Sequence, residues 1–386
     1  MPDLLSHSCP GCCGDSSLTW ARTRSKATAG TNCWRKRCEQ SKRSTAVETQ
    51  YLIVDEFGVF VGKHSERLQV RKGEELLQEA PLFNLEGVII TGRGVALSAD
   101  AVTACADAGI PVHFVHVSGR ISASIFSAGL TGTIQTRRSQ LEAAHSRHGV
   151  ALAKAFALGK ISNQAVLIRY LAKYRKGIKP DLHRELEQRA AEIMACAAEL
   201  RALPGRTAEE IRLSLLSIEG HAAEKYWEAI RLVVRVPSDW KGRSGRGATD
   251  PVNAALNYGY GILYSQVERA IVLAGLDPYA GFIHADRPGK PSLVLDLVEE
   301  FRVPVVDRTV FAMINRGTQL ELDADNLLVQ KTRRTIAENV LARLDKAERY
   351  ERKKLSLRHI IQYQARHIAT FVRGERATYK PFVVRW

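Results

Sequence analysis

The stretch YLIVDEFGVFVGKHSERLQVRKG, residues 51–73, decides the fold class of the N-terminal part of this chain. Short runs rich in β-branched and aromatic residues are broken here by Gly58, Gly62 and Gly73, a pattern typical of strands joined by turns. Further strand-like runs continue as far as RISASIF, residues 120–126. We therefore predict a small β-rich domain over residues 48–130.

After Gly132 the apolar residues recur with the 3.6-residue period of amphipathic helices. The pattern begins in RRSQLEAAHSRHGVALAKAFALGKISNQAVLIRYLAKY, residues 137–174, and continues in later segments. It predicts a larger α-helical domain over residues 131–386. The expected fold class is α+β, with the β-rich domain first and the helical domain second.

Residues 1–47 show no hydrophobic period and are rich in Ser, Thr, Gly and Arg, so we expect them to be disordered and dispensable for catalysis. Five of the seven cysteines lie here: Cys9, Cys12, Cys13, Cys33 and Cys38. Their spacing is too irregular for a zinc ribbon, and free thiols in a reducing compartment are the expected state.

The composition favours a protein that binds a polyanion. Lys and Arg number 56 against 41 Asp and Glu, which gives a formal net charge of +15. Such an excess favours DNA or RNA over a neutral metabolite as the partner. No apolar run approaches the roughly 20 residues of a membrane helix. No signal peptide is visible either, so we expect a cytoplasmic protein without membrane contact.

A first candidate for chemistry is Glu219 in SIEGHAAEKYW, residues 217–227. On a helix, Glu219, Ala223 and Tyr226 share one face, which predicts a part-buried carboxylate in need of a partner. Gly220 beside it would let another backbone come close. Taken alone, Glu219 fits a surface glutamate of an amphipathic helix better.

A second candidate is GFIHADRPGKPSLVLDLVEEFR, residues 281–302. His284 ends an apolar run, and a helix that starts near Ser292 places Asp296 and Glu299 three residues apart on one face. Two neighbouring carboxylates repel each other unless a cation or proton lies between them. With a histidine they offer the N and O ligands that suit Mn²⁺ and Mg²⁺. A solvated acidic helix face with a structural histidine is the equal alternative.

Between these two segments lies KGRSGRGATDPVNAALNYGYG, residues 241–261, with a basic, Gly-rich stretch before the helix start at Asp250. A flexible basic loop of this kind can fold onto a phosphate backbone. We predict DNA contacts from Lys241, Arg243, Arg246, Asn253 and Asn257. The alternative is a simple linker followed by ordinary polar groups of a helix.

Together with residues 51–62, these three segments resemble, in order and spacing, the CRISPR-associated integrase–endonuclease family over roughly residues 50–375. The resemblance implies that Glu219, His284 and Glu299 converge as ligands of Mg²⁺ or Mn²⁺, with Asp296 at a further acidic catalytic position. The last acidic position is often Asp in the family and is Glu here, which leaves open whether Asp296 or Glu299 lies closer to the metal. The resemblance also implies a homodimer and a small ferredoxin-like adaptation partner.

The function implied by the resemblance is integration of short foreign DNA fragments, called spacers, into a CRISPR repeat array. A 3′-hydroxyl of double-stranded DNA attacks a phosphodiester of the repeat DNA, and hydrolysis is the same reaction with water as the nucleophile. Two other classes of function remain open. One is a DNA-binding scaffold without catalysis, and the other is an RNA-directed nuclease unrelated to CRISPR.

Overall fold

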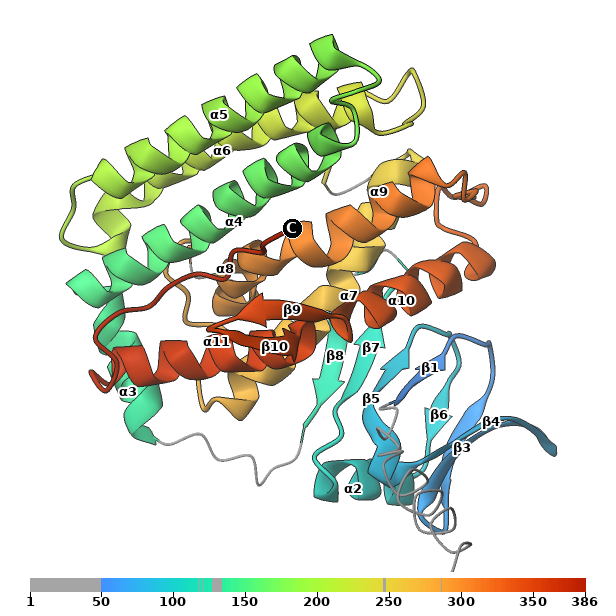
Figure 1. Cartoon of the computed structure of the whole chain (residues 1–386). Helices are drawn as coiled ribbons and strands as arrows, with labels where there is room; N and C mark the ends of the chain where they lie inside the picture. Colours follow the sequence, from blue (N-terminus) through green and yellow to red (C-terminus); the bar gives the residue numbers. More distant parts are fainter. Residues whose placement is uncertain (1–49, 118, 120, 127–133, 246–247, 286) are drawn as a thin grey trace, which may run out of the picture. The chain divides into compact units, whose positions relative to one another are not determined.

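The computed structural model describes residues 50–386, apart from 118, 120, 127–133, 246–247 and 286 (Figure 1). The predictions for residues 1–47 therefore lie outside the described residues, as does Arg246. The two cysteines of the described part, Cys105 and Cys196, are both free and buried. Among the helices of these residues, none combines the length and apolarity needed to cross a membrane.

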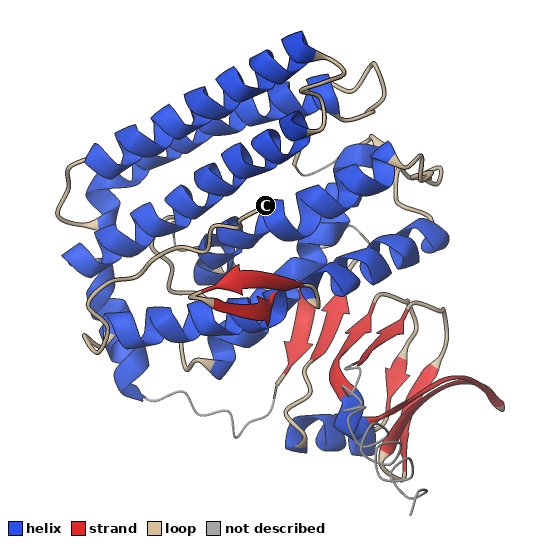
Figure 2. Cartoon of the chain, in the orientation of Figure 1, coloured by secondary structure: helices blue, strands red, loops and turns tan. Residues whose placement is uncertain are grey.

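The β-rich part holds two four-stranded sheets (Figure 2). The first sheet has the order β1 (Gln50–Val54), β5 (Leu85–Ile90), β7 (Val112–Val115), β8 (Ile121–Ile125). The second has the order β4 (Glu75–Pro81), β3 (Arg67–Lys72), β2 (Phe60–His64), β6 (Ala96–Leu97). In the first sheet β1, β5 and β7 are parallel and β8 is antiparallel to β7. A short 3-10 turn, η1 (Leu82–Asn84), and the helix α2 (Ala99–Asp107) connect the strands.

The rest of the chain is mostly helical, which confirms the predicted fold class. The helices are α3 (Ile134–Ala144), α4 (Arg147–Lys173), α5 (Pro180–Ala202), α6 (Ala208–Val233), α7 (Pro251–Leu273), α8 (Ser292–Phe301), the π-helical η2 (Arg302–Asp307), α9 (Arg308–Asn315), α10 (Gln330–Leu344) and α11 (Leu357–Val372). A hairpin, β9 (Ala347–Tyr350) and β10 (Lys353–Ser356), precedes α11. Its turn places Glu351 and Arg352 at φ 42° and 68°, without the glycine that usually marks such a turn in a sequence.

Helix α8 lies against α4 and α7 in the interior of the helical part (Figure 1). Every residue of α8 except Leu295 is buried, including the carboxylates of Asp296, Glu299 and Glu300. Burial of an ionised carboxylate is unfavourable unless partners compensate for the lost water. The position of α8 therefore requires that each of these side chains be paired within the protein.

Helix α4 approaches α8 closely at Gly159. A Cβ atom at Gly159 would lie 2.8 Å from Cγ of Glu300, so only glycine permits this distance between the two helices. The approach brings the next residue, Lys160, beside Glu299. The expectation of a close backbone approach at Gly220 was wrong, because a Cβ atom there would meet nothing within 4 Å.

The β-rich part contacts α7 at a pair of glycines, Gly119 and Gly261. A Cβ atom on Gly261 would lie 1.5 Å from the carbonyl oxygen of Gly119, in the turn before β8. Nearby, the Tyr51 hydroxyl donates a hydrogen bond to Gln266 Oε1 at 2.8 Å. Gly261, in the YGYG run of α7, thus allows the close contact between this helix and the turn before β8 of the first sheet.

His113 in β7 makes the fold sensitive to acid. Its side chain is fully buried, and burial together with Arg269 lowers the pKa of His113 to about 4. The Ser124 hydroxyl donates to Glu268, so Nδ1 of His113 is the donor to Ser124 Oγ at 2.9 Å. Nε2 is buried without a hydrogen-bond partner, and a proton there would place an unpaired charge in the interior.

We predict that the free energy of unfolding falls as the pH drops from about 6.5 toward 4. Between these pH values the imidazole of His113 binds a proton in the unfolded chain but not in the folded chain. The contribution of neutral His113 to stability is therefore complete above the unfolded pKa and is lost as the pH falls below it. For His113 this loss is about 2 kcal/mol at pH 5. Urea unfolding of the wild type and His113→Gln at pH 7.5 and 5 measures it. Equal losses of stability in both proteins would contradict the role of His113.

Candidate active site

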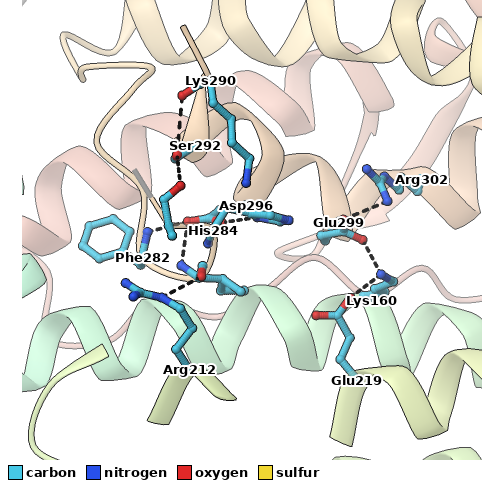
Figure 3. A network of polar contacts seen from close by, with 12 residues as sticks. Lys160, Arg212, Glu219, Phe282, His284, Lys290, Ser292, Asp296, Glu299 and Arg302 are labelled. Atoms are coloured by element: carbon cyan, nitrogen blue, oxygen red, sulfur yellow. Dashed lines mark hydrogen bonds and ion pairs between the residues drawn. The ribbon is translucent and has the colours of Figure 1, made fainter. Parts of the chain in front are cut away.

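The side chains of Glu219 in α6 and Glu299 in α8 lie on either side of Lys160 in α4 (Figure 3). The Lys160 ammonium donates a hydrogen bond to Glu219 Oε1 and lies 2.9 Å from Glu299 Oε2. The other oxygen of Glu299, Oε1, is 2.9 Å from the guanidinium of Arg302. Residues that are 59 and 80 positions apart in the sequence thus form one chain of alternating charges.

The electrostatic balance keeps the two middle groups of this chain, Glu299 and Lys160, charged. Burial alone would raise the pKa of Glu299, but Arg302, Lys160 and His284 together lower it below its ordinary value. Burial alone would lower the pKa of Lys160, but Glu299 and Glu219 outweigh burial and raise it. The ionised carboxylate of Glu299 and the cations of Lys160 and Arg302 therefore share a region from which most water is excluded.

One oxygen of this cluster has no hydrogen bond. Glu299 Oε2 is buried and accepts none, although the Lys160 nitrogen is only 2.9 Å away. The short distance makes the contact an ion pair, while its direction does not fit a hydrogen bond. A buried anionic oxygen that is held by an ion pair rather than by a directed hydrogen bond is chemically suited to a cation with several ligand positions.

Asp296 has a different role from Glu299. Its Oδ2 accepts the backbone N–H groups of Phe282 and Ile283 at 2.5 and 3.0 Å, and Oδ1 accepts that of His284 at 3.1 Å. Oδ1 also lies 2.7 Å from His284 Nδ1. Both oxygens are thus occupied within the protein, and Glu299 is the α8 carboxylate that faces Glu219.

The contact with Asp296 orients the imidazole of His284. Because a carboxylate only accepts, Nδ1 carries the hydrogen, which leaves Nε2 as the nitrogen with a lone pair in the neutral imidazole. A carboxylate that fixes a histidine in this way is the usual support of a metal-binding imidazole. The contacts of Asp296 are those of a positioning residue, because its oxygens are used by the backbone and by His284, and its direct part in catalysis stays a prediction.

The structure brings the predicted site residues near one another but not into one set of ligands. Glu219 and Glu299 share Lys160, and His284 is close enough to lower the pKa of Glu299. Within the part of the chain that the structure describes, no three His, Cys, Asp or Glu side chains are grouped as metal ligands. The Lys160 ammonium occupies the space between the two carboxylates.

The predicted DNA-binding loop lies next to the same cluster. Arg243 donates to Asn253 Oδ1 at 3.1 Å and to Asn257 Oδ1 at 2.6 Å. The guanidinium groups of Arg243 and Arg302 lie 5.4 and 5.0 Å from the centre of the Tyr260 ring. Through this ring the loop is anchored beside Arg302, the partner of Glu299.

Asn253 does not have the expected role. Its side chain is 1% exposed, and its amide nitrogen donates to Gly242 O at 2.9 Å and to Asp250 at 2.7 Å. Asn253 therefore holds the loop in place, and its predicted contact with DNA would need the loop to open. Asn257 is half-buried and also bonds to the loop, through Gly245 O at 2.9 Å. Lys241 is exposed.

Comparison with known proteins shows what this architecture is similar to. The sequence profile of the family "CRISPR associated protein Cas1" matches residues 52–341. The CRISPR-associated endonuclease Cas1 1 of Archaeoglobus fulgidus is 38% identical over 346 residues, which cover 87% of this chain and 99% of the relative. The CRISPR-associated endonuclease Cas1 1 of Francisella tularensis subsp. novicida is 32% identical over 340 residues, which cover 87% of this chain and 100% of the relative.

Solved structures share the fold. A casposase bound to an integration product superposes with a TM-score of 0.71 at 22% identity, covering 86% of this chain and 92% of that chain. A chain of a Cas6-RT-Cas1–Cas2 complex superposes with a TM-score of 0.70 at 21% identity. The match covers 87% of this chain and 36% of that chain. A CAS1 protein from Thermotoga maritima superposes with a TM-score of 0.65 at 19% identity. The match covers 86% of this chain and 100% of that chain.

Proposed function

Because this chain belongs to the Cas1 family of CRISPR-associated proteins, we propose that it is the DNA endonuclease and integrase of CRISPR adaptation, and that its activity depends on a divalent metal ion. In this reaction the 3′-hydroxyl of a short DNA fragment attacks a phosphodiester of the repeat array. The curated relatives named above are CRISPR-associated endonucleases, and this chain covers nearly their whole length.

The observation that carries the proposal is the pair of carboxylates of Glu219 and Glu299, largely withdrawn from water and bridged by Lys160, next to a basic loop. Burial of charges is unfavourable, and a scaffold that only binds DNA would be more stable with apolar side chains at these positions. An active site for phosphoryl transfer needs such groups, because the charge of the reacting phosphate has to be neutralised in a fixed geometry.

Mg²⁺ or Mn²⁺ fits the donor set of Glu219, Glu299 and His284. Glu299 Oε2, which pairs with Lys160 without a directed hydrogen bond, and Nε2 of His284 are the atoms with lone pairs to offer. When bound there, a divalent ion would neutralise the phosphodiester and stabilise the leaving oxygen. Asp296 holds His284 in orientation, Arg302 keeps Glu299 ionised, and the loop around Arg243 holds the phosphate backbone.

We further propose that the substrates are double-stranded DNA with free 3′ ends and CRISPR repeat DNA. A small ferredoxin-like adaptation protein and a second copy of this chain complete the assembly. Proteins of the same fold were solved with an integration product and in a complex with Cas2, which motivates both proposals.

The proposal is tested by a strand-transfer assay with the purified protein. Labelled DNA duplexes with a 3′-hydroxyl or a 3′-deoxy end are mixed with repeat DNA in Mn²⁺, Mg²⁺ or EDTA. We expect joined product only with a 3′-hydroxyl and a divalent ion. DNA binding without any joining or cleavage would favour the scaffold, and full activity in EDTA would contradict the metal requirement.

The basic loop gives a separate prediction about binding. Neutralising Arg243 and Arg246 to Gln should weaken the binding of DNA of any sequence, because contacts to phosphates carry no base information. Each lost contact to duplex DNA should reduce the slope of log K against log salt by about 0.9. Arg169 and Arg184, whose charges are paired on the surface of α4 and α5, are the matched control pair for the same substitution. An equal slope in both double variants would show that the loop is only a linker.

A further inference from the structure

Lys160 places a cation at the position where the proposed function needs a metal ion. Its ammonium contacts Glu219 from α6 and Glu299 from α8, the two carboxylates of the proposed site (Figure 3). We propose that Lys160 is a built-in counter-cation that competes with the divalent ion for these carboxylates and thereby lowers the affinity of the site for metal. The inference rests on the proposed function.

The need for a counter-cation follows from burial. The side chains of Glu219 and Glu299 are 12% and 2% exposed, so water cannot screen their repulsion well. Lys160 compensates both charges at once. A divalent ion can be held by both carboxylates only after Lys160 has given up both ion pairs, and the free energy of these pairs is subtracted from that of metal binding.

Of the two cations paired with Glu299, Lys160 and Arg302, the contacts indicate that Lys160 is the one that can move away. Arg302 is held firmly: its guanidinium pairs with Glu299, bonds to the Tyr264 hydroxyl at 2.5 Å and lies over the ring of Tyr260. Lys160 donates a hydrogen bond to Glu219, but its contact with Glu299 Oε2 at 2.9 Å is an ion pair outside good hydrogen-bond geometry. When Lys160 moves, Arg302 therefore keeps the Glu299 carboxylate in place for the metal.

The side chain of Lys160 also has the freedom to move. It is 15% exposed, and a lysine reaches its contacts through a flexible four-carbon stem. The exchange therefore needs rotation of one side chain and no movement of a helix. A purely structural ion pair would behave differently, since its removal would disorder the carboxylates and weaken metal binding.

The test is isothermal titration of the full-length protein with Mn²⁺. Lys160→Met removes the charge and keeps the length of the side chain, and we expect it to bind Mn²⁺ at least about tenfold more tightly than the wild type. Lys160→Arg keeps the charge and should stay within about threefold of the wild type. Lys154→Met is the matched control on the same helix, because among the described residues the Lys154 ammonium bonds to the backbone carbonyls of Arg201 and Leu203 and to no carboxylate.

A second readout is thermal stability. In EDTA, Lys160→Met leaves the two carboxylates without their shared cation, so its melting temperature should be lower than that of the wild type. Saturating Mn²⁺ should raise the melting temperature of Lys160→Met more than that of the wild type. If Lys160→Met does not fold, Lys160→Gln serves as a second neutral variant.

The outcomes separate the inference from the function on which it rests. A wild type that binds Mn²⁺, together with a neutral variant that binds it equally or more weakly, overturns the counter-cation role alone. A wild type and variants that all fail to bind Mn²⁺ overturn both the metal site and the inference. Neutral variants whose unfolding excess Mn²⁺ does not reverse would likewise show that Lys160 is structural.

Discussion

Glu219→Gln is expected to reduce the rate of DNA strand transfer by on the order of a thousandfold or more, while the affinity for DNA stays close to that of the wild type. The substitution keeps the size of the side chain and removes its charge, so the proposed site loses one of its two ionised carboxylates. In the proposed mechanism these groups serve the transition state and not the binding of DNA. His284→Ala and Glu299→Gln should have effects of the same size.

The matched control for Glu219→Gln is Glu224→Gln. Glu224 lies in the same helix, α6, but is exposed to solvent. It should retain full strand transfer, and circular dichroism should show that both variants are folded. Normal strand transfer by Glu219→Gln would rule out the proposed mechanism.

Asp296→Ala is expected to be the most destabilising substitution at the site, with a loss on the order of 4 kcal/mol in the free energy of unfolding. The change removes the acceptor of three backbone N–H groups, those of Phe282, Ile283 and His284, and leaves them buried without a partner. Each such loss is unfavourable by about 1 to 3 kcal/mol. The orientation of His284 is lost as well, so strand transfer should fail even below the melting temperature.

Denaturant unfolding of Asp296→Ala and Asp277→Ala measures this effect. Asp277 also accepts a backbone N–H, that of Tyr279 at 2.8 Å, but in a part-exposed loop. Its substitution should lower stability by about 1 kcal/mol. If Asp296→Ala lowers the free energy of unfolding no more than Asp277→Ala does, Asp296 is not the acceptor that holds the backbone from Phe282 to His284.

Much of the fold could be predicted because its signals are local. The Asp250-Pro251 pair predicted a helix start, and α7 begins at Pro251 with the Asp250 side chain accepting the N–H of Asn253 at 2.8 Å. The Pro291-Ser292 pair likewise predicted the start of α8. The β9–β10 hairpin was missed, because its turn uses Glu351 and Arg352 in place of glycine or asparagine.

The candidate site could be predicted only in part, because its arrangement depends on contacts between distant helices. Lys160 carries no local signal: it stands in an ordinary amphipathic helix, and only the approach of α4 to α8 at Gly159 gives it a role. Asp296 and Glu299 were predicted to share a face. Their spacing could not show that Asp296 turns to the backbone at Phe282 and Glu299 to Lys160.

A crystal of the full-length protein grown with Mn²⁺ tests the central claim most directly, through the anomalous signal of the metal. The account predicts one peak between α6 and α8, with oxygens of Glu219 and Glu299 and Nε2 of His284 at about 2.0 to 2.3 Å from it. It also predicts that the Lys160 ammonium has left the space between the two carboxylates. A site without a peak, or a peak whose ligands do not include Glu219 and Glu299, would contradict the account.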